Sequence, residues 1–257
     1  MRRLSVGMGA FLLLASVACG GQRSKEAGVL DYLRKYTGTP SNKACVAATA
    51  CCWKAVKEAG LEPEWVDVDM FLPQNKAQRD QYKRIVIPTA TEWFTLKMYE
   101  GMDDYVRSGG LLVTNCSCIL LDANENYKVD KEDATTEYCR DNFLGVRGHA
   151  SALMRQIRVI QECPLTKGLE QNAWITLEKE MAGRQTTNHS AEVLILSNRV
   201  VRGEAKGEQP FLTYKHIKNG ACIYLVGQIG DKMDKNVRQI VANIFSAETL
   251  EWLCLQE

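Results

Sequence analysis

The stretch Gln81–Asp122 decides the fold, and it reads QYKRIVIPTATEWFTLKMYEGMDDYVRSGGLLVTNCSCILLD. Its first apolar run, Ile85–Ile87, precedes a segment whose apolar residues recur every three or four positions, which predicts a helix. The apolar face of that helix carries Leu96, Tyr99, Met102 and Val106. Two glycines at 109–110 end the helix, and a second apolar run follows at Leu111–Val113. The stretch therefore predicts a strand, a helix and a second strand.

Similar signals precede this stretch. The segments Gly28–Leu33 and Glu64–Val68 are typical of short strands. Helices are predicted at about 43–59, where Gly60 supplies a stop signal, and at about 75–82. Strands that alternate with helices in this way predict a parallel sheet with helices on both faces.

In the second half of the chain, the pattern changes from alternating strands and helices to mainly strands. A helix is predicted at about 134–144, before Gly145. Five further strands are predicted at Met154–Ile160, Ala173–Leu177, Val193–Ser197, Phe211–Ile217 and Ala221–Val226. Lys218-Asn219-Gly220, between the last two, is a strong hairpin signal. We therefore expect antiparallel additions to the sheet, followed by a closing helix at Asp234–Ala247.

Composition bounds the possible functions. The chain has 257 residues, of which 46% are apolar and 25% charged, and this is ordinary globular usage. The formal net charge is +1, and no basic block resembles a nucleic-acid footprint, so we expect no nucleic-acid partner. No apolar run of 18 residues follows the N-terminal segment, so no internal membrane span is expected.

The N-terminal residues predict export. Arg2-Arg3 and the apolar stretch Val6–Ala18 are typical of a signal segment. Cys19 occupies a position that resembles a bacterial lipobox, although the usual leucine three residues earlier is Ser16. We favour lipid attachment at Cys19 over simple secretion. The expected organisation is a signal segment at 1–19, a tether at 20–27 and one domain at 28–257, held at the bacterial cell envelope.

The ten cysteines suit an exported chain, in which disulfides can form. Without Cys19 nine remain, so at least one thiol stays unpaired. Their spacing lacks paired Cys-x-x-Cys motifs, which argues against zinc. We expect most to be small buried core residues, with one or two disulfide bridges.

A polar loop faintly resembles a calcium-binding loop. Asp122, Asn124 and Asn126 supply oxygen ligands at suitable spacing. The glycine that such a loop requires is replaced by Tyr127, and the closing glutamate by Asp133. We therefore favour a solvated loop, and we expect neither a metal nor a cofactor.

Several segments together resemble the class I glutamine amidotransferase-like superfamily. They are YKRIVIPTA, YVRSGGLLVTN, FLGVRG, ECPLTKGL and FLTYKHIKNGACIYLVGQIGD, in that order. The nearest branches are the trimerisation domain of glycoside hydrolase 42 β-galactosidases, the ThuA-like proteins and the N-terminal domain of biotin-protein-ligase-like proteins. The resemblance spans about Gly28–Phe245. It implies a flavodoxin-like, three-layer α/β/α sandwich.

The resemblance also implies a position for a nucleophile. In true amidotransferases a cysteine sits on a sharp turn after the strand, and here Cys116 occupies that position. Three departures argue against the reaction. Thr114 and Cys118 replace the elbow glycines, Thr89-Ala90-Thr91 replaces the glycine-rich oxyanion loop, and Gly227–Asp231 lacks the base histidine. The only histidines are His149, His189 and His216.

Two hypotheses follow. In the first, the domain is non-catalytic and binds a ligand or partner where the parallel strands end, with Thr89, Asn115 and Cys116 lining the crevice. A carbohydrate-handling context and homo-oligomerisation are implied by the resemblance alone. In the second, the protein is a hydrolase or transferase that uses Cys116 as nucleophile.

Overall fold

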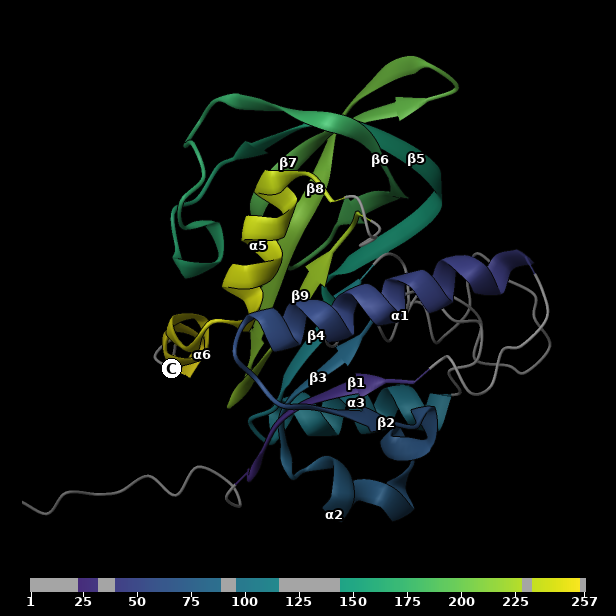
Figure 1. The fold of residues 1–257 in the computed structure, drawn as a ribbon, viewed down its shortest axis with the longest axis vertical. Helices are drawn as coiled ribbons and strands as arrows, with labels where there is room; N and C mark the ends of the chain where they lie inside the picture. The colour runs from purple at the N-terminus through teal and green to yellow at the C-terminus, as the bar shows by residue number, and fades with distance from the viewer. Residues whose placement is uncertain (1–22, 32–39, 89–95, 116–143, 228–232, 255–257) are drawn as a thin grey trace, which may run out of the picture.

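The computed structural model describes residues 23–31, 40–88, 96–115, 144–227 and 233–254. Within these ranges the strands form one mixed sheet of nine, in the order β2-β1-β3-β4-β9-β8-β7-β5-β6. Neighbouring strands from β2 to β9 in that order run parallel, and the remaining pairs are antiparallel. The predicted α/β class, with a parallel sheet and antiparallel additions in the second half, is confirmed (Figure 1).

The parallel half consists of short strands with mostly buried side chains. They are β1 (Lys25–Leu30), β2 (Pro63–Val66), β3 (Tyr82–Ile87), β4 (Leu111–Asn115) and β9 (Gly220–Leu225). Ile85 pairs with Leu112 and Ile87 with Thr114 in parallel register. The two apolar runs are therefore adjacent parallel strands, as predicted. Strands that are buried on both faces read as continuous apolar runs, which is why this half is visible in the sequence.

Helices cover both faces of the parallel half, and this produces three layers (Figure 1). The bounds of the helices are α1 (Pro40–Glu58), α2 (Lys76–Arg79), α3 (Leu96–Arg107), α5 (Lys235–Phe245) and α6 (Ala247–Cys254). Helices α1 and α5 pack against each other on one face, and α3 lies on the other. Tyr99, Met102 and Val106 are fully buried on the predicted face of α3.

The antiparallel half consists of longer strands than predicted. They are β5 (Val146–Val159), β6 (Trp174–Asn188), β7 (Glu192–Val201) and β8 (Glu204–Ile217). Exposed polar residues extend β6 and β8 beyond their apolar segments, and a search for apolar runs detects only the buried part of these two strands. The predicted hairpin is confirmed, because Ile217 pairs with Gly220 and Lys218 adopts a φ of 55°.

The antiparallel half curls back onto the end of the parallel half. Gly183 of β6 forms an isolated antiparallel bridge with Gly227, just beyond β9. A Cβ atom on Gly183 would lie 2.7 Å from the carbonyl oxygen of Val226, so only glycine permits this approach. The crossing joins strands that are far apart in the order of the sheet.

Two predicted boundaries need correction. Strand β1 begins at Lys25, so residues 25–27 of the predicted tether belong to the sheet. The closing helix ends at Phe245, and a second helix, α6, follows it. The break arises because the Oγ of Ser246 accepts a hydrogen bond from the backbone N–H of Thr249 (3.1 Å), which caps a new helix.

Asp234 connects α5 to the edge strand β6. It is buried, and its carboxylate accepts hydrogen bonds from the backbone N–H groups of Asn236 (2.7 Å) and Glu178 (2.8 Å). The first bond caps α5, and the second satisfies an amide at the edge of the sheet.

Asp234→Ala should therefore lower the free energy of unfolding by about 2 kcal/mol. The substitution removes the cap of α5 and leaves the Glu178 N–H without this acceptor. Urea denaturation followed by circular dichroism measures the loss. Asp234→Ser, which keeps a capping oxygen on a shorter side chain, should lose about half as much. Equal losses in the two variants would contradict a capping contribution.

Candidate functional site

The carboxyl ends of the parallel strands lie together at one edge of the sheet, which we call the carboxyl edge. The β3–β4 register, with Ile87 opposite Thr114, places the last residues of these strands side by side. In open α/β sheets, ligands bind outside this edge. Thr89 and Cys116, two of the predicted site residues, come directly after this region and lie outside the described residues.

Asn115 is the predicted site residue that the structure describes. Its side chain is 1% exposed. Its Nδ2 atom donates hydrogen bonds to the carbonyl oxygens of Leu225 (3.2 Å) and Gly227 (2.5 Å). The amide therefore joins the end of β4 to the end of β9 and satisfies two backbone carbonyls there.

A close approach of backbones continues this connection. Gly227, which accepts the bond from Asn115, also forms the bridge to Gly183. The side chain of Met181 fills the space that a Cβ atom on Gly227 would need. Asn115, Gly227 and Gly183 thus tie β4, β9 and β6 together at the carboxyl edge, and we call these three residues the edge clamp.

His216, one of the described histidines, is separated from the carboxyl edge along the sheet. His216 pairs with Ala221, four residues before Leu225, so about 13 Å of strand separates it from the carboxyl edge. His189 is exposed and follows β6, where its backbone N–H donates to the carbonyl oxygen of Gly145 (2.9 Å). The side chain of His149 lies outside the described residues.

Three described cysteines, Cys52, Cys163 and Cys222, are free thiols. Burial raises the pKa of the Cys52 and Cys222 thiols far above the ordinary value, and it also raises the pKa of the Cys163 thiol. Because the thiolate is the reactive form, burial makes these cysteines poor nucleophiles. Cys51, Cys52 and Cys222 fit the predicted role of small core residues.

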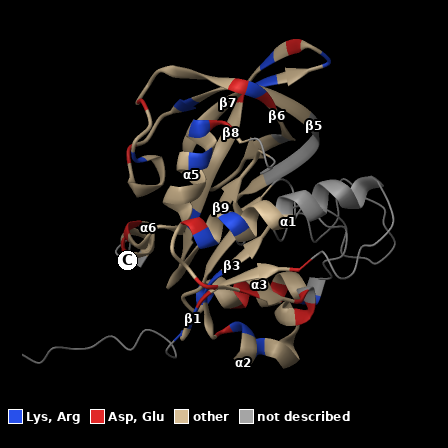
Figure 2. Cartoon of the chain, viewed as in Figure 1, with Lys and Arg blue, Asp and Glu red and all other residues tan. Residues whose placement is uncertain are grey.

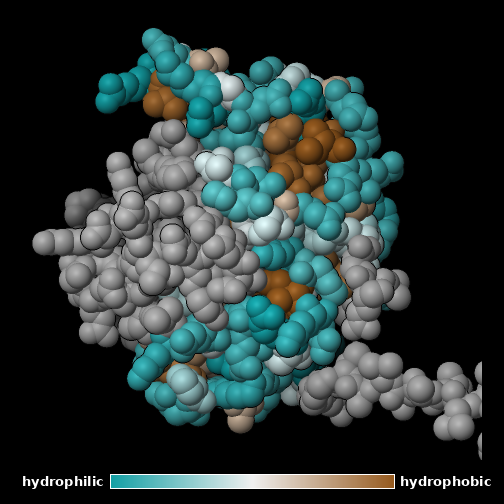
Figure 3. Space-filling model, turned by 180° about the vertical axis from the view of Figure 1, so that it is seen from behind, coloured by the Kyte–Doolittle hydropathy of each residue, from teal (hydrophilic) through white to brown (hydrophobic). Residues whose placement is uncertain are grey.

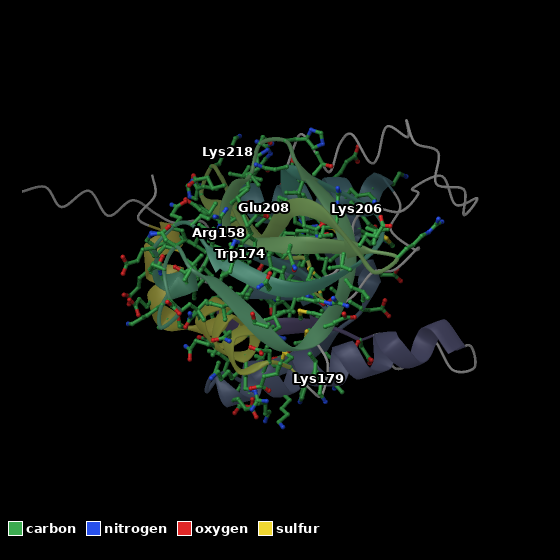
Figure 4. The ribbon with its side chains drawn as sticks, turned by 90° about the horizontal axis from the view of Figure 1, so that it is seen from above. Arg158, Trp174, Lys179, Lys206, Glu208 and Lys218 are labelled. Carbon is green, nitrogen blue, oxygen red and sulfur yellow. The ribbon has the colours of Figure 1, made fainter. Side chains whose placement is uncertain are left out.

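An exposed cluster on the antiparallel half was missed by the sequence analysis. The Arg158 guanidinium lies 4.9 Å from the ring centre of Trp174 and pairs with Glu208 (2.9 Å). Figure 4 shows these side chains together on β5, β6 and β8. The only sequence signal was a tryptophan within an otherwise alternating strand. Polar side chains around an exposed aromatic ring are suited to recognition as well as to stability.

The surface offers further apolar area. Figure 3 shows patches of apolar residues among hydrophilic ones on the face seen from behind. Among the residues that the structure describes, the exposed large apolar side chains are Leu153, Ile160 and Trp174, which are 37–41% exposed.

The described residues were searched for metal-binding groups and for helices that could span a membrane. They contain no group of three or more His, Cys, Asp or Glu side chains that could hold a metal ion. The calcium-like segment 122–133 lies outside them. None of the described helices has the length and apolar character to cross a bilayer.

Comparisons with known proteins bear on the fold. No family model matches the sequence, and no curated protein matches it. A putative ThuA-like protein from Bacteroides uniformis superimposes with a TM-score of 0.62 at 17% identity, covering 87% of this chain and 90% of that one. The chain has a flavodoxin-like, ThuA-type fold.

Two β-galactosidases share the same fold in part of their length. The enzyme from Bacillus circulans sp. alkalophilus gives a TM-score of 0.58 at 14% identity, and a GH42 enzyme from G. stearothermophilus gives 0.57 at 12%. The alignments cover 86% and 85% of this chain, but only 31% and 29% of the enzymes. The chain spans less than a third of these enzymes, and identities this low establish the fold alone.

The edge clamp is testable through Asn115. Asn115→Ala would leave the Leu225 and Gly227 carbonyls without these donors in a buried place, so it should lower the free energy of unfolding by about 1–3 kcal/mol. Thermal and urea denaturation measure this. The control, Asn219→Ala in the exposed turn before β9, should change stability by less than about 0.5 kcal/mol. Similar losses in both variants would argue against the clamp.

Proposed function

We propose that this protein is an exported, lipid-anchored, non-catalytic amidotransferase-like domain that binds a ligand or partner at the carboxyl edge of its sheet. The observation that carries the proposal is the edge clamp. The Asn115 amide and the Gly227 and Gly183 backbones hold β4, β9 and β6 together at the carboxyl edge. Such an edge is a rigid binding scaffold.

The chemistry of a cysteine nucleophile supports the same proposal. A thiol at position 116 would need a base within hydrogen-bond reach, or within reach through one water molecule. The segment after Gly227, where the superfamily has its histidine, reads Gln228-Ile229-Gly230-Asp231. His216 is separated from this edge by about 13 Å of strand.

We also propose that the protein acts in a carbohydrate-handling context. This context is supported by the β-galactosidases that share the fold and by the sequence resemblance to their trimerisation domain. Fold similarity alone does not transfer a ligand, so this part is an analogy. The exposed Trp174, flanked by Arg158 and Glu208, is a second surface on which a ligand ring could stack.

The alternative function is a hydrolase or transferase that uses Cys116, and the place of Cys116 in the sequence favours it. Cys116 directly follows Asn115 at the end of β4, where the fold places chemistry. The reactivity of the thiol distinguishes the two functions.

Cys116 in the folded protein should react with iodoacetamide no faster than a free thiol, and the rate should rise as pH passes through about 8.5 or above. The thiolate is the reacting form, so this profile reports the pKa. Mass spectrometry of peptides after timed labelling follows each cysteine separately. The buried Cys52 and Cys222 should stay unlabelled and serve as internal references for the folded state.

Rapid labelling of the Cys116 thiol by iodoacetamide below pH 7 would contradict the non-catalytic proposal. Loss of an esterase or amidase activity in Cys116→Ala, without loss of folding, would do the same.

Lipid attachment has a separate test. Metabolic labelling with a fatty-acid analogue should mark the wild-type chain in the membrane fraction, because Cys19 would carry the acyl chains. The Cys19→Ala variant should remain unlabelled and be released in soluble form. Equal labelling of both chains would refute attachment at Cys19.

A further inference from the structure

The first described side chain fixes the N-terminal segment to one edge of the sheet. The Nη1 atom of Arg23 donates to the carbonyl oxygens of Tyr82 (2.9 Å) and Asp80 (3.3 Å). Its Nη2 atom donates to the carbonyl oxygen (3.0 Å) and the hydroxyl (2.9 Å) of Ser108. The guanidinium also lies over the Tyr105 ring, 4.8 Å from its centre. Arg23 therefore connects the chain to both the start of β3 and the residue after α3.

These contacts all lie at the amino ends of the parallel strands, opposite the carboxyl edge. We call this the amino edge. Strand β1 starts here at Lys25, whose backbone N–H donates to the carbonyl oxygen of Gln81 (2.9 Å). The turn before β9 is here too, since Asn219 lies against Gly109. In Figure 1 the starts of β1 and β3 and the β8–β9 turn lie on the same side of the sheet.

Charges at the amino edge largely neutralise one another. Lys25 pairs with Glu64 (2.6 Å), Lys83 with Glu26 (2.5 Å) and Arg107 with Asp103 (2.7 Å). Figure 2 shows basic and acidic residues mixed in this region. Such a surface can approach lipid headgroups without strong repulsion. It has no excess of positive or negative charge that would orient the domain at the membrane. Orientation must therefore come from the tether.

The tether to a lipidated Cys19 would be very short. Cys19 precedes Arg23 by four residues, which span at most about 14 Å when fully extended. A domain of about 230 residues has a radius of gyration of about 17 Å, so its diameter is well over twice the tether length. A domain that is pinned at Arg23 cannot turn its opposite side toward the membrane.

We infer that the amino edge of the parallel sheet faces the lipid headgroups and that the carboxyl edge, with the edge clamp, points into the aqueous phase. This inference rests on the proposed lipid attachment at Cys19. It also narrows the partner of the candidate site. A site that faces away from the bilayer takes a water-soluble ligand or a protein that approaches from the aqueous side, and not a membrane lipid.

Two exposed lysines serve as matched reporter positions. Lys218 lies in the turn before β9, at the amino edge. Lys97 lies in the first turn of α3, which follows β3 and so begins at the carboxyl edge. Lys218→p-azidophenylalanine and Lys97→p-azidophenylalanine each accept one fluorophore, and the lipidated chains are bound to vesicles that contain a headgroup-linked quencher.

The edges are about 17 Å apart along a six-residue strand, so quenching at position 218 should exceed that at position 97 by about twofold or more. Inserting about twelve Gly and Ser residues between Gly21 and Gln22 should abolish the difference, because a flexible tether of that length lets the domain turn over. Equal quenching without the insertion, or stronger quenching at position 97, would overturn the inference.

Failure of lipid attachment is distinguished by a second preparation. A mature chain that begins at Gly20 and carries a synthetic diacyl lipid on its amino terminus has the same short tether, whatever the cell does at Cys19. If fatty-acid labelling fails but this chain shows the quenching difference, attachment at Cys19 is wrong and the orientation imposed by Arg23 stands. If labelling succeeds and the difference is absent in both preparations, the orientation is wrong and lipid attachment stands.

Discussion

The rest of the structure depends on the parallel register from β1 through β3 and β4 to β9. Its strands are apolar runs that are buried on both faces of the sheet. The register gathers all carboxyl ends at one edge and all amino ends at the other. Asn115 fixes the end of that register, since its amide bonds to carbonyls of β9 and of the residue beyond it.

The antiparallel half is coupled to this register through backbone contact. Gly183 and Gly227 approach so closely that a Cβ atom on either would meet neighbouring atoms. Asp234 adds a second connection, because it caps α5 and binds an amide of β6. The antiparallel half and the parallel half are therefore joined by backbone and side-chain contacts at the carboxyl edge.

The sequence revealed buried features more readily than contacts between distant segments. Two kinds of local pattern made these features predictable. Burial on both faces leaves continuous apolar runs, as at Ile85–Ile87 and Leu111–Val113, and burial of one helix face leaves the helical period of α3. The full length of β6 was missed because exposed polar residues, such as Glu178 and Lys179, extend it. The bonds from Asn115 to carbonyls more than a hundred positions away, the Arg158–Trp174 stack and the Gly183–Gly227 bridge depend on tertiary packing, which no local pattern encodes.

The same geometry separates attachment from recognition. A parallel strand has two chemically different ends, and six residues of strand hold them about 17 Å apart. Arg23 fastens the chain at the amino end, while the edge clamp lies at the other. If the chain is held at its amino end, as we propose, the carboxyl edge is the part of the sheet that is presented to solution. The direction of the strands supplies that presentation without any further element.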